Sequence, residues 1–172
     1  MSDLNVRAAT VKDAEALHAL VSAHLQEGHL LPRDLEEIRR HADRFVVCGR
    51  RGHLRACAEL APLSASVAEV RSLVVASDYR RTGVAARLID ELRERARSLG
   101  FETLCAFTHD ARVFVRQGFS IVPHLWVPEK ITTDCLSCPL FRRCGQHAMV
   151  LPIHLGDRRG TADADTRRVA VA

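Results

Sequence analysis

The segment from residue 67 to residue 100 constrains the fold more than any other part of the chain. Residues 67–75 form a largely apolar run, which predicts a buried strand. Between residues 83 and 99, apolar side chains recur at three- and four-residue spacing, which predicts an amphipathic helix, and Gly100 is suited to end it. The loop of residues 76–82 is short, so the strand is expected to lead directly into the helix N-terminus.

The remaining pattern predicts a mixed α/β layer rather than a regularly alternating doubly wound sheet. Further strands are expected over residues 4–8, 44–48, 53–63, 103–107, 119–122 and 149–153, and further helices over 11–27, with Thr10 as its cap, 33–43 and 111–117. Residues 1–153 are expected to form one domain. Residues 154–172 are polar and aperiodic, which predicts a disordered tail.

Charge and hydropathy exclude several classes of protein. The net charge of the 172 residues is +4, but the arginines are interleaved with Asp and Glu, which indicates a solvated surface rather than a nucleic-acid-binding stripe. No apolar run approaches the ~20 residues that a membrane helix needs, and the N-terminus lacks the features of a signal peptide. We therefore expect a cytoplasmic protein, monomer or homodimer, with small-molecule ligands and neither nucleic-acid nor membrane partners.

The loop that enters the long helix has the composition of a pyrophosphate cradle. A helix N-terminus presents unpaired N–H groups and the positive end of the helix dipole. Two small residues let phosphate oxygens approach the backbone, and two arginines add positive charge. The alternative is a plain capped helix N-terminus. The cradle residues are Arg80, Arg81, Thr82, Gly83, Val84 and Ala85.

This loop resembles the signature of the GNAT acetyltransferase superfamily, Arg/Gln-x-x-Gly-x-Gly/Ala between a strand and a helix. Arg80, Gly83 and Ala85 match the signature, and Gly118 and Phe119 fit the family's downstream strand–helix unit. The resemblance covers residues 4 to 123. It implies a GNAT fold, with a central, mostly antiparallel sheet of six to seven strands flanked by helices, and acetyl-CoA as the co-substrate of an N-acetyltransferase.

A narrower resemblance is to the acetyltransferase domain of bacterial N-acetylglutamate synthases. It rests on residues 26–33, 56–60, 68–75 and 104–108, and residues 128–139 look like the ending of short, single-domain members. It implies acetylation of the α-amino group of L-glutamate, a step of arginine biosynthesis. The chain has no room for the kinase-like domain of longer synthases, so feedback inhibition through that domain is not expected. Another amine acceptor and a non-catalytic acetyl-CoA sensor stay open as alternatives.

The resemblance also implies how acetyl-CoA is held. The strand before the cradle is expected to splay from its neighbour, so that pantetheine pairs with the exposed backbone of Leu73, Val74 and Val75, where an N–H group can stabilise the oxyanion. Phe114 is expected to pack against pantetheine or the core. Val115 stands where many members carry a tyrosine general acid, so this acid is expected to be missing.

Candidate residues for the acceptor side follow from the same resemblance. Glu69 is the predicted general base, with Glu59 in reserve and a solvent-facing strand glutamate as the alternative. Glu69 and Arg71 are two residues apart on one strand, so their side chains are expected on one face. The acceptor carboxylates are predicted to bind four side chains that can donate hydrogen bonds: Arg33, Arg71, Lys130 and Thr108. The alternative for each is an ordinary surface group.

A cysteine cluster follows at residues 134–147. Cys135, Cys138, Cys144 and His147 supply three thiolates and an imidazole, which is the number of ligands of a structural zinc site. A reduced cysteine-rich turn or one disulfide are the alternatives. In each case the segment is expected to hold the C-terminal part of the domain rather than to perform chemistry.

Overall fold

The computed structural model describes residues 5–27 and 30–153. Its centre is a seven-stranded sheet with the order β1-β2-β3-β4-β5-β7-β6. Neighbouring strands are antiparallel except for β4 and β5, which are parallel, so the predicted mostly antiparallel sheet is confirmed. The strands are Val6–Ala8 (β1), Phe45–Arg50 (β2), His53–Pro62 (β3), Val67–Val75 (β4), Thr103–Thr108 (β5), Ser120–Val122 (β6) and His147–Pro152 (β7).

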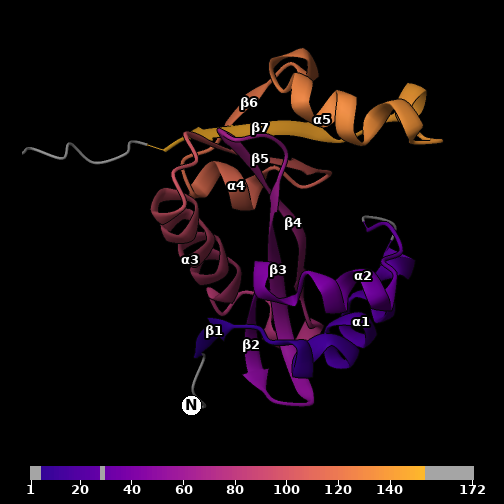
Figure 1. Ribbon diagram of the computed structural model, residues 1–172, viewed down its shortest axis with the longest axis vertical. Coiled ribbons are helices and arrows are strands. Elements are labelled where there is room, and N and C mark those ends of the chain that lie inside the picture. The colour runs from indigo at the N-terminus through magenta and orange to yellow at the C-terminus, as the bar shows by residue number, and fades with distance from the viewer. Residues whose placement is uncertain (1–4, 28–29, 154–172) are drawn as a thin grey trace, which may run out of the picture.

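Helices cover both faces of this sheet (Figure 1). On one face lie α1 (Ala14–Ala23) and α2 (Leu35–Arg40), and on the other lies α3 (Val84–Ser98), with α4 (Arg112–Arg116) beside it. The last helix, α5 (Pro128–Thr133), follows β6 and lies beside β7 in Figure 1. None of the helices in the described part of the chain is long and apolar enough to span a membrane.

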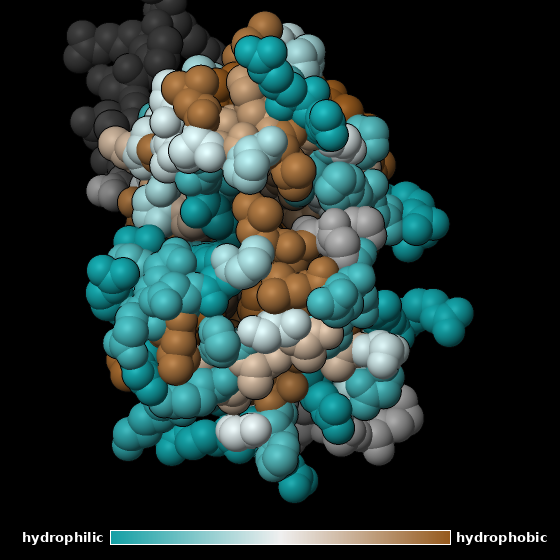
Figure 2. All heavy atoms as spheres, turned by 90° about the vertical axis from the view of Figure 1, so that its right-hand side faces the viewer, coloured by the Kyte–Doolittle hydropathy of each residue, from teal (hydrophilic) through white to brown (hydrophobic). Residues whose placement is uncertain are grey.

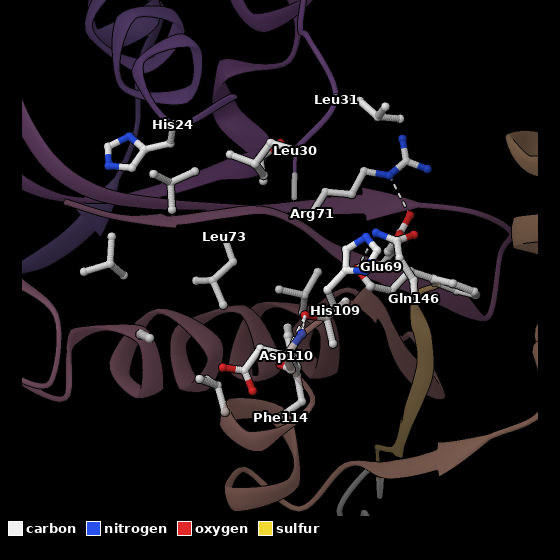
Figure 3. Close-up of a pocket in the computed structure, with 18 of the residues that line it drawn as sticks. His24, Leu30, Leu31, Glu69, Arg71, Leu73, His109, Asp110, Phe114 and Gln146 are labelled. Carbon is white, nitrogen blue, oxygen red and sulfur yellow. Dashed lines mark hydrogen bonds and ion pairs between the residues drawn. The ribbon is translucent and has the colours of Figure 1, made fainter. Parts of the chain in front are cut away.

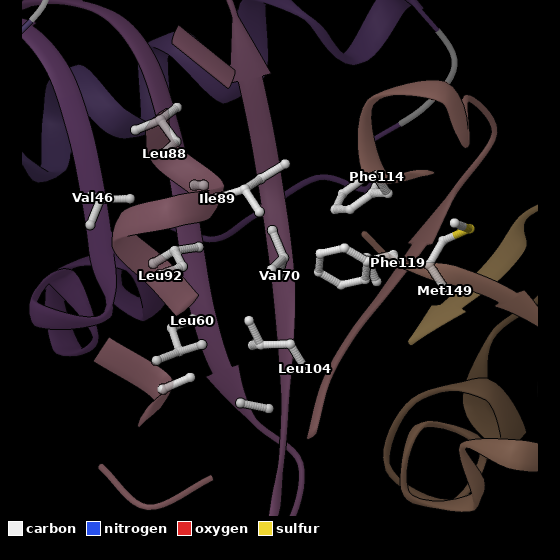
Figure 4. Packing of buried hydrophobic residues seen from close by; sticks show 14 of the residues in the cluster. Val46, Leu60, Val70, Leu88, Ile89, Leu92, Leu104, Phe114, Phe119 and Met149 are labelled. Carbon is white, nitrogen blue, oxygen red and sulfur yellow. The ribbon is translucent and has the colours of Figure 1, made fainter. Parts of the chain in front are cut away.

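Two of the three buried apolar clusters hold these helices on the sheet. In the larger cluster, the inward stripe of α3, with Leu88, Ile89 and Leu92 fully buried, packs on strands β2 to β5 and on Phe114 and Phe119 (Figure 4). The second cluster joins α1 and α2 to the opposite face of β2 and β3. Burying an aliphatic side chain contributes roughly 1.5–3 kcal/mol, so these two contacts fix the position of each helix on the sheet.

The start of α1 is fixed by a buried carboxylate. Asp13 accepts a hydrogen bond from the backbone N–H of Thr10 at 2.9 Å and forms an ion pair with Arg7 in β1 at 2.7 Å. The Asp13 side chain is fully buried, and the hydrogen bonds from Arg7 hold its pKa well below the usual range. The predicted cap is therefore confirmed, and it also ties the first helix to the edge strand.

The predicted elements differ from the structure mainly in length. The helix expected over residues 11–27 is divided into the 3₁₀ turn Val11–Asp13, α1 and the 3₁₀ turn Leu25–Glu27, and the helix expected over 33–43 is shortened to α2. Helix α5 was not predicted. The tail expected over 154–172 lies outside the described residues.

Candidate active site

A cleft of ≈ 1240 Å³ runs along β4 from the loop before α3 to α5. In Figure 2, apolar side chains gather in a hollow across the middle of the face on which α1, α2 and α5 lie. Figure 3 shows that Glu69, Arg71, His109 and Gln146 come together at one end of this cleft, while His24 lies at the other end. The cleft thus has one end at the predicted cradle and the other at the predicted acceptor residues.

The cleft exists because β4 and β5 separate. Their parallel pairing covers only Val67–Glu69 of β4, against Thr103–Cys105 of β5. Beyond this point β5 continues to pair with β7, whereas β4 continues to pair with β3. The expected splay is confirmed, and it leaves the edge of β4 open to an extended ligand. The residues of this open edge that line the cleft include Leu73, Val74 and Val75.

A β-bulge lies at the centre of the open edge. The pairing of β3 with β4 shifts by one residue, so that Ala58 faces both Ser72 and Leu73. Ser72 adopts a φ of +49°, a left-handed backbone that costs of order 1–3 kcal/mol in a residue other than glycine. Bulges re-aim neighbouring groups of a strand, and strained backbone is concentrated at functional sites. The bulge therefore makes the middle of the cleft a candidate for the reacting centre.

At the cradle, backbone N–H groups point out of the N-terminus of α3. The first helical bond runs from the N–H of Arg87 to the carbonyl of Gly83 at 3.2 Å, so Val84 and the two residues after it have no acceptor inside the helix. Gly83 has a φ of +84°, and nothing lies within 4 Å of the position that a Cβ would take. Arg81 also has a left-handed φ, +63°. This geometry fits the predicted anion cradle, which Ala85 also lines.

The side chains of the cradle loop are held by internal contacts. Thr82 donates its hydroxyl hydrogen to the carbonyl of Tyr79 at 2.6 Å. Arg80 donates from Nε to the carbonyl of Val75 at 3.1 Å and forms an ion pair with Glu27 at 2.7 Å. Both partners of the ion pair are about half exposed, with 45% and 46% of their side-chain surface accessible. The guanidinium predicted to bind phosphate is therefore already paired with a carboxylate.

At the opposite end, four charged side chains form one network. Oε2 of Glu69 accepts hydrogen bonds from Nε of Arg71 at 2.6 Å and from Nζ of Lys130 at 2.8 Å. Both cations also bind Asp134, with 2.8 Å between its Oδ2 and Nζ of Lys130. Burial lowers the pKa of Arg71, but the charge of Glu69 and the hydrogen bond to Glu69 outweigh this, so the pKa lies above its ordinary value. The prediction that Glu69 and Arg71 share a face is confirmed.

Arg33 and Glu59 form a second, deeper ion pair. Nη1 of Arg33 lies 2.7 Å from Oε2 of Glu59 and donates to the hydroxyl oxygen of Ser72 at 2.9 Å, and its Nη2 pairs with Glu37 at 2.8 Å. Burial lowers the pKa of Arg33, but its contacts with Glu59 raise it above its ordinary value. Glu59 does not line the cleft, whereas Glu69 does. The geometry therefore favours Glu69 over Glu59 as the residue that can reach a substrate.

The other predicted residues lie on the walls of the cleft. The hydroxyl of Thr108 donates to the carbonyl of Asp110 and accepts from its N–H, each at 3.1 Å, so it is used locally. Phe114 is buried and packs edge-to-face on Phe119, with ring centroids 5.2 Å apart. Val115 is half exposed and, unlike Phe114, does not line the cleft. The position at which many family members carry the tyrosine is therefore at the protein surface here.

The predicted zinc site is wrong. Among residues 5–27 and 30–153, no group of three or more His, Cys, Asp or Glu side chains is placed to hold a metal ion. His147 begins β7 and is held opposite Thr108 by the ladder, whereas Cys144 is exposed in the turn before it. Burial raises the pKa of Cys135, and the neighbouring Cys144, Asp134 and Cys138 also raise it, whereas Lys130 lowers it. The cysteines are free, so the structure shows the reduced turn rather than a disulfide.

Sequence reasoning missed the carboxylates that face the predicted cations. Glu27 and Asp134 lie within segments 26–33 and 128–139, on which the resemblance rests, but no role was predicted for either. Their arginine partners lie 53 and 63 residues away in the chain. One signal was available for Asp134. Pro128 occupies the first turn of α5, where proline is favoured, and Asp134 stands four residues after Lys130, the spacing of a helical ion pair.

Known proteins are similar to this chain in sequence. The chain is 30% identical over 149 residues to an uncharacterized N-acetyltransferase of Chlorobaculum tepidum, which covers 87% of this chain and 96% of that protein. It is 36% identical over 117 residues to the amino-acid acetyltransferase of Pseudomonas putida, covering 67% of this chain and 27% of that protein. The chain therefore spans about a quarter of the longer relative.

Solved structures agree with these relatives. N-acetylglutamate synthase from Neisseria gonorrhoeae, in complex with coenzyme A and N-acetyl-glutamate, superposes with a TM-score of 0.77 at 25% identity and covers 90% of this chain and 36% of that one. A Mycobacterium tuberculosis protein in complex with CoA shares the fold, with a TM-score of 0.73 at 21% identity, and covers 86% of this chain and 98% of that one.

The profile of one protein family matches most of the chain. This profile, described as "Acetyltransferase (GNAT) family", matches residues 14–119, from the start of α1 to the residue before β6. The matched range contains the splayed strands, the bulge and the predicted cradle, whereas Lys130 and Asp134 at the far end of the cleft lie beyond it. The chain belongs to the GNAT family of acetyltransferases and is an acetyl-CoA-dependent N-acetyltransferase.

Proposed function

We propose that this enzyme acetylates the α-amino group of L-glutamate. The observation that carries the proposal is the position of Arg71 and Lys130, two cations at the end of the cleft opposite the cradle, next to the carboxylate of Glu69. Arginine and lysine bind carboxylates through charge-assisted hydrogen bonds. The synthase from Neisseria gonorrhoeae, which superposes on the chain, was solved with coenzyme A and N-acetyl-glutamate, and this supports the same pair of substrates.

The donor binds along the open edge of β4. The pyrophosphate of acetyl-CoA binds the N–H groups at the start of α3 and the guanidinium groups of Arg80 and Arg81. Pantetheine pairs with the backbone of Leu73, Val74 and Val75 as an added strand would. This path brings the thioester to the bulge at Ser72, where a backbone N–H group stabilises the oxyanion.

Proton transfer then follows from the acceptor end. Glu69 takes one ammonium proton through a water molecule, so that the free amine attacks the carbonyl carbon of the thioester. A C–N bond forms, the C–S bond breaks as the tetrahedral intermediate collapses, and the CoA thiolate takes the second nitrogen proton through water. Because no tyrosine stands at position 115, water replaces the acid that many members carry at that position. The product serves arginine biosynthesis in the cytoplasm.

An acceptor panel tests the proposal. Purified enzyme is assayed for thiol release from acetyl-CoA with L-glutamate, L-glutamine, L-aspartate, L-arginine and spermidine at matched concentrations. The expected result is the highest kcat/KM for L-glutamate, with L-glutamine lower by about tenfold or more because one charge-assisted contact is lost. A faster reaction with spermidine or another amine would refute the acceptor, while leaving the acetyltransferase activity intact.

A further inference from the structure

The network around Arg71 and Lys130 is electrically complete without a ligand. It contains two cations and two carboxylates, Glu69 and Asp134, and each cation contacts both carboxylates. The formal charges of the four groups cancel. A carboxylate that enters this end of the cleft therefore meets a neutral cluster rather than a free positive charge, unless one of the two internal carboxylates leaves.

The two carboxylates differ in how easily they can leave. The side chain of Glu69 is 4% exposed and lies on β4, which is paired with β3 on one side and, at Glu69 itself, with β5 on the other. The side chain of Asp134 is 33% exposed and follows the last residue of α5, a six-residue helix. A strand in the middle of a sheet is far harder to displace than the end of a short surface helix. Asp134 is therefore the exchangeable member.

All four residues line the same cleft as the cradle. When Asp134 leaves, Glu69, Arg71 and Lys130 carry a net charge of +1, which matches one carboxylate of an acceptor. The side chains of Arg71 and Lys130 are only 24% and 14% exposed, so these cations are shielded from bulk water and favour a partner that forms direct hydrogen bonds.

We propose that Asp134 is a specificity-determining residue that occupies the position of an acceptor carboxylate between Arg71 and Lys130, and that the acceptor binds by displacing it. The inference rests on the proposed function and names the part of the site that selects for a carboxylate. A neutral or cationic group cannot replace Asp134, because the two cations would then lose an anionic partner. Selection arises through competition with an internal carboxylate as well as through attraction.

The competition has a predictable size. A tethered carboxylate acts at an effective concentration on the order of millimolar or more, so it weakens the apparent affinity for a free carboxylate without any change in the final contacts. Removal of Asp134 should therefore tighten the binding of the acceptor. A residue that only held Arg71 and Lys130 in place would have the opposite effect, since its loss would weaken binding.

The experiment is a calorimetric titration of the CoA-loaded protein with L-glutamate and, separately, with glutarate, which has two carboxylates and no amine. We expect Asp134→Ala to bind both about tenfold more tightly than the wild type, while the affinity for CoA stays the same. Asp134→Asn keeps the size of the side chain and should shift in the same direction. Asp90→Ala is the matched control, because Asp90 pairs with Arg93 on the exposed face of α3 at 3.3 Å, outside the cleft.

The outcomes separate the inference from the proposed function. Weaker or unchanged binding of both ligands by Asp134→Ala and Asp134→Asn overturns the inference, even if L-glutamate is acetylated. If Asp134→Ala does not fold, as judged by its thermal transition, the result with Asp134→Asn decides. Tighter binding of glutarate by the variants, combined with a preference of the wild type for some other amine, would support the carboxylate site and refute L-glutamate as the acceptor.

Discussion

Glu69 in β4 and Lys130 in α5 are 61 residues apart in the chain, yet Oε2 of Glu69 lies 2.8 Å from Nζ of Lys130. This contact attaches the C-terminal part of the domain to the strand on which the reaction is proposed to take place. Glu69 also binds Arg71 on its own strand, so one carboxylate orients both cations of the acceptor end. A change at Glu69 should therefore affect acceptor binding and proton transfer together.

The first prediction concerns the cradle. Replacing Gly83 with alanine places a methyl group where phosphate oxygens approach, and it forces a left-handed φ on a residue that avoids it. We expect the dissociation constant of acetyl-CoA to rise about tenfold or more, measured by calorimetric titration.

Gly100→Ala is the control for backbone strain. Gly100 has the same φ of +84° and the same open space around its missing Cβ, but it lies after the C-terminus of α3, outside the cleft. Both variants should lose similar stability, of about 1 kcal/mol, and only Gly83→Ala should lose affinity. Equal affinities in the two variants would remove the cradle assignment.

The second prediction concerns the ion pair between Glu27 and Arg80. Because acetyl-CoA phosphate must compete with Glu27 for this guanidinium, Glu27→Gln should lower the Michaelis constant of acetyl-CoA, by roughly two- to fivefold for an exposed pair. The same assay on Glu15→Gln, which removes an exposed pair with Arg39 outside the cleft, should give wild-type values. An increase in the Michaelis constant of Glu27→Gln would mean that Glu27 positions Arg80 for the phosphate instead.

The third prediction concerns the buried pair of Arg33 and Glu59. Arg33→Met leaves the carboxylate of Glu59, whose side chain is 2% exposed, without its cation, and should lower the free energy of unfolding by about 3 kcal/mol. Adding Glu59→Leu should recover most of this loss, because this buried site accommodates two apolar side chains better than one unpaired charge. Urea denaturation of the two single variants and the double variant measures the coupling. Strictly additive losses would show that the pair does not act as a unit.

The fourth prediction concerns Glu69 as the general base. Glu69→Gln keeps the size of the side chain but cannot accept the proton, so kcat should fall ~10²–10⁴-fold, most severely at low pH where the free amine is scarce. Glu59→Gln is the comparison, since Glu59 is a buried glutamate on the adjacent strand that does not line the cleft. Its kcat should fall far less at every pH. A Glu69→Gln variant that remains fully active across the pH range would show that Glu69 is structural.

Local patterns predicted the elements that carry most of the site. The helix α3 could be located because its apolar spacing matches the side chains that are buried, and Gly100 follows its last turn. The shared face of Glu69 and Arg71 follows from the two-residue period of a strand. The loop predicted to be the cradle could be placed before α3 because a glycine at a helix N-terminus is a local feature, and Gly83 has the positive φ that favours glycine.

Other parts of the site depend on tertiary structure, and the sequence alone could not show them. Helix α5 has no fully buried residue, so it lacks the apolar period that reveals a helix. The pairs Glu27–Arg80 and Asp134–Arg71 join segments that only the folded sheet brings together. The cysteine spacing suggested a metal site because the sequence shows how many candidate ligands there are. Metal binding also requires that the ligands converge on one point, and the candidate ligands in the described residues do not.

Identifying the reaction product shows whether L-glutamate is the acceptor. The enzyme is supplied with acetyl-CoA carrying ¹³C at the acetyl carbonyl and with ¹⁵N-labelled L-glutamate, and the reaction is followed by NMR and by thiol release. We expect a ¹³C–¹⁵N coupled amide signal of N-acetyl-L-glutamate that grows in step with the released CoA thiol. Release of the thiol without that signal, or no consumption of acetyl-CoA in the presence of L-glutamate, would contradict the proposed function.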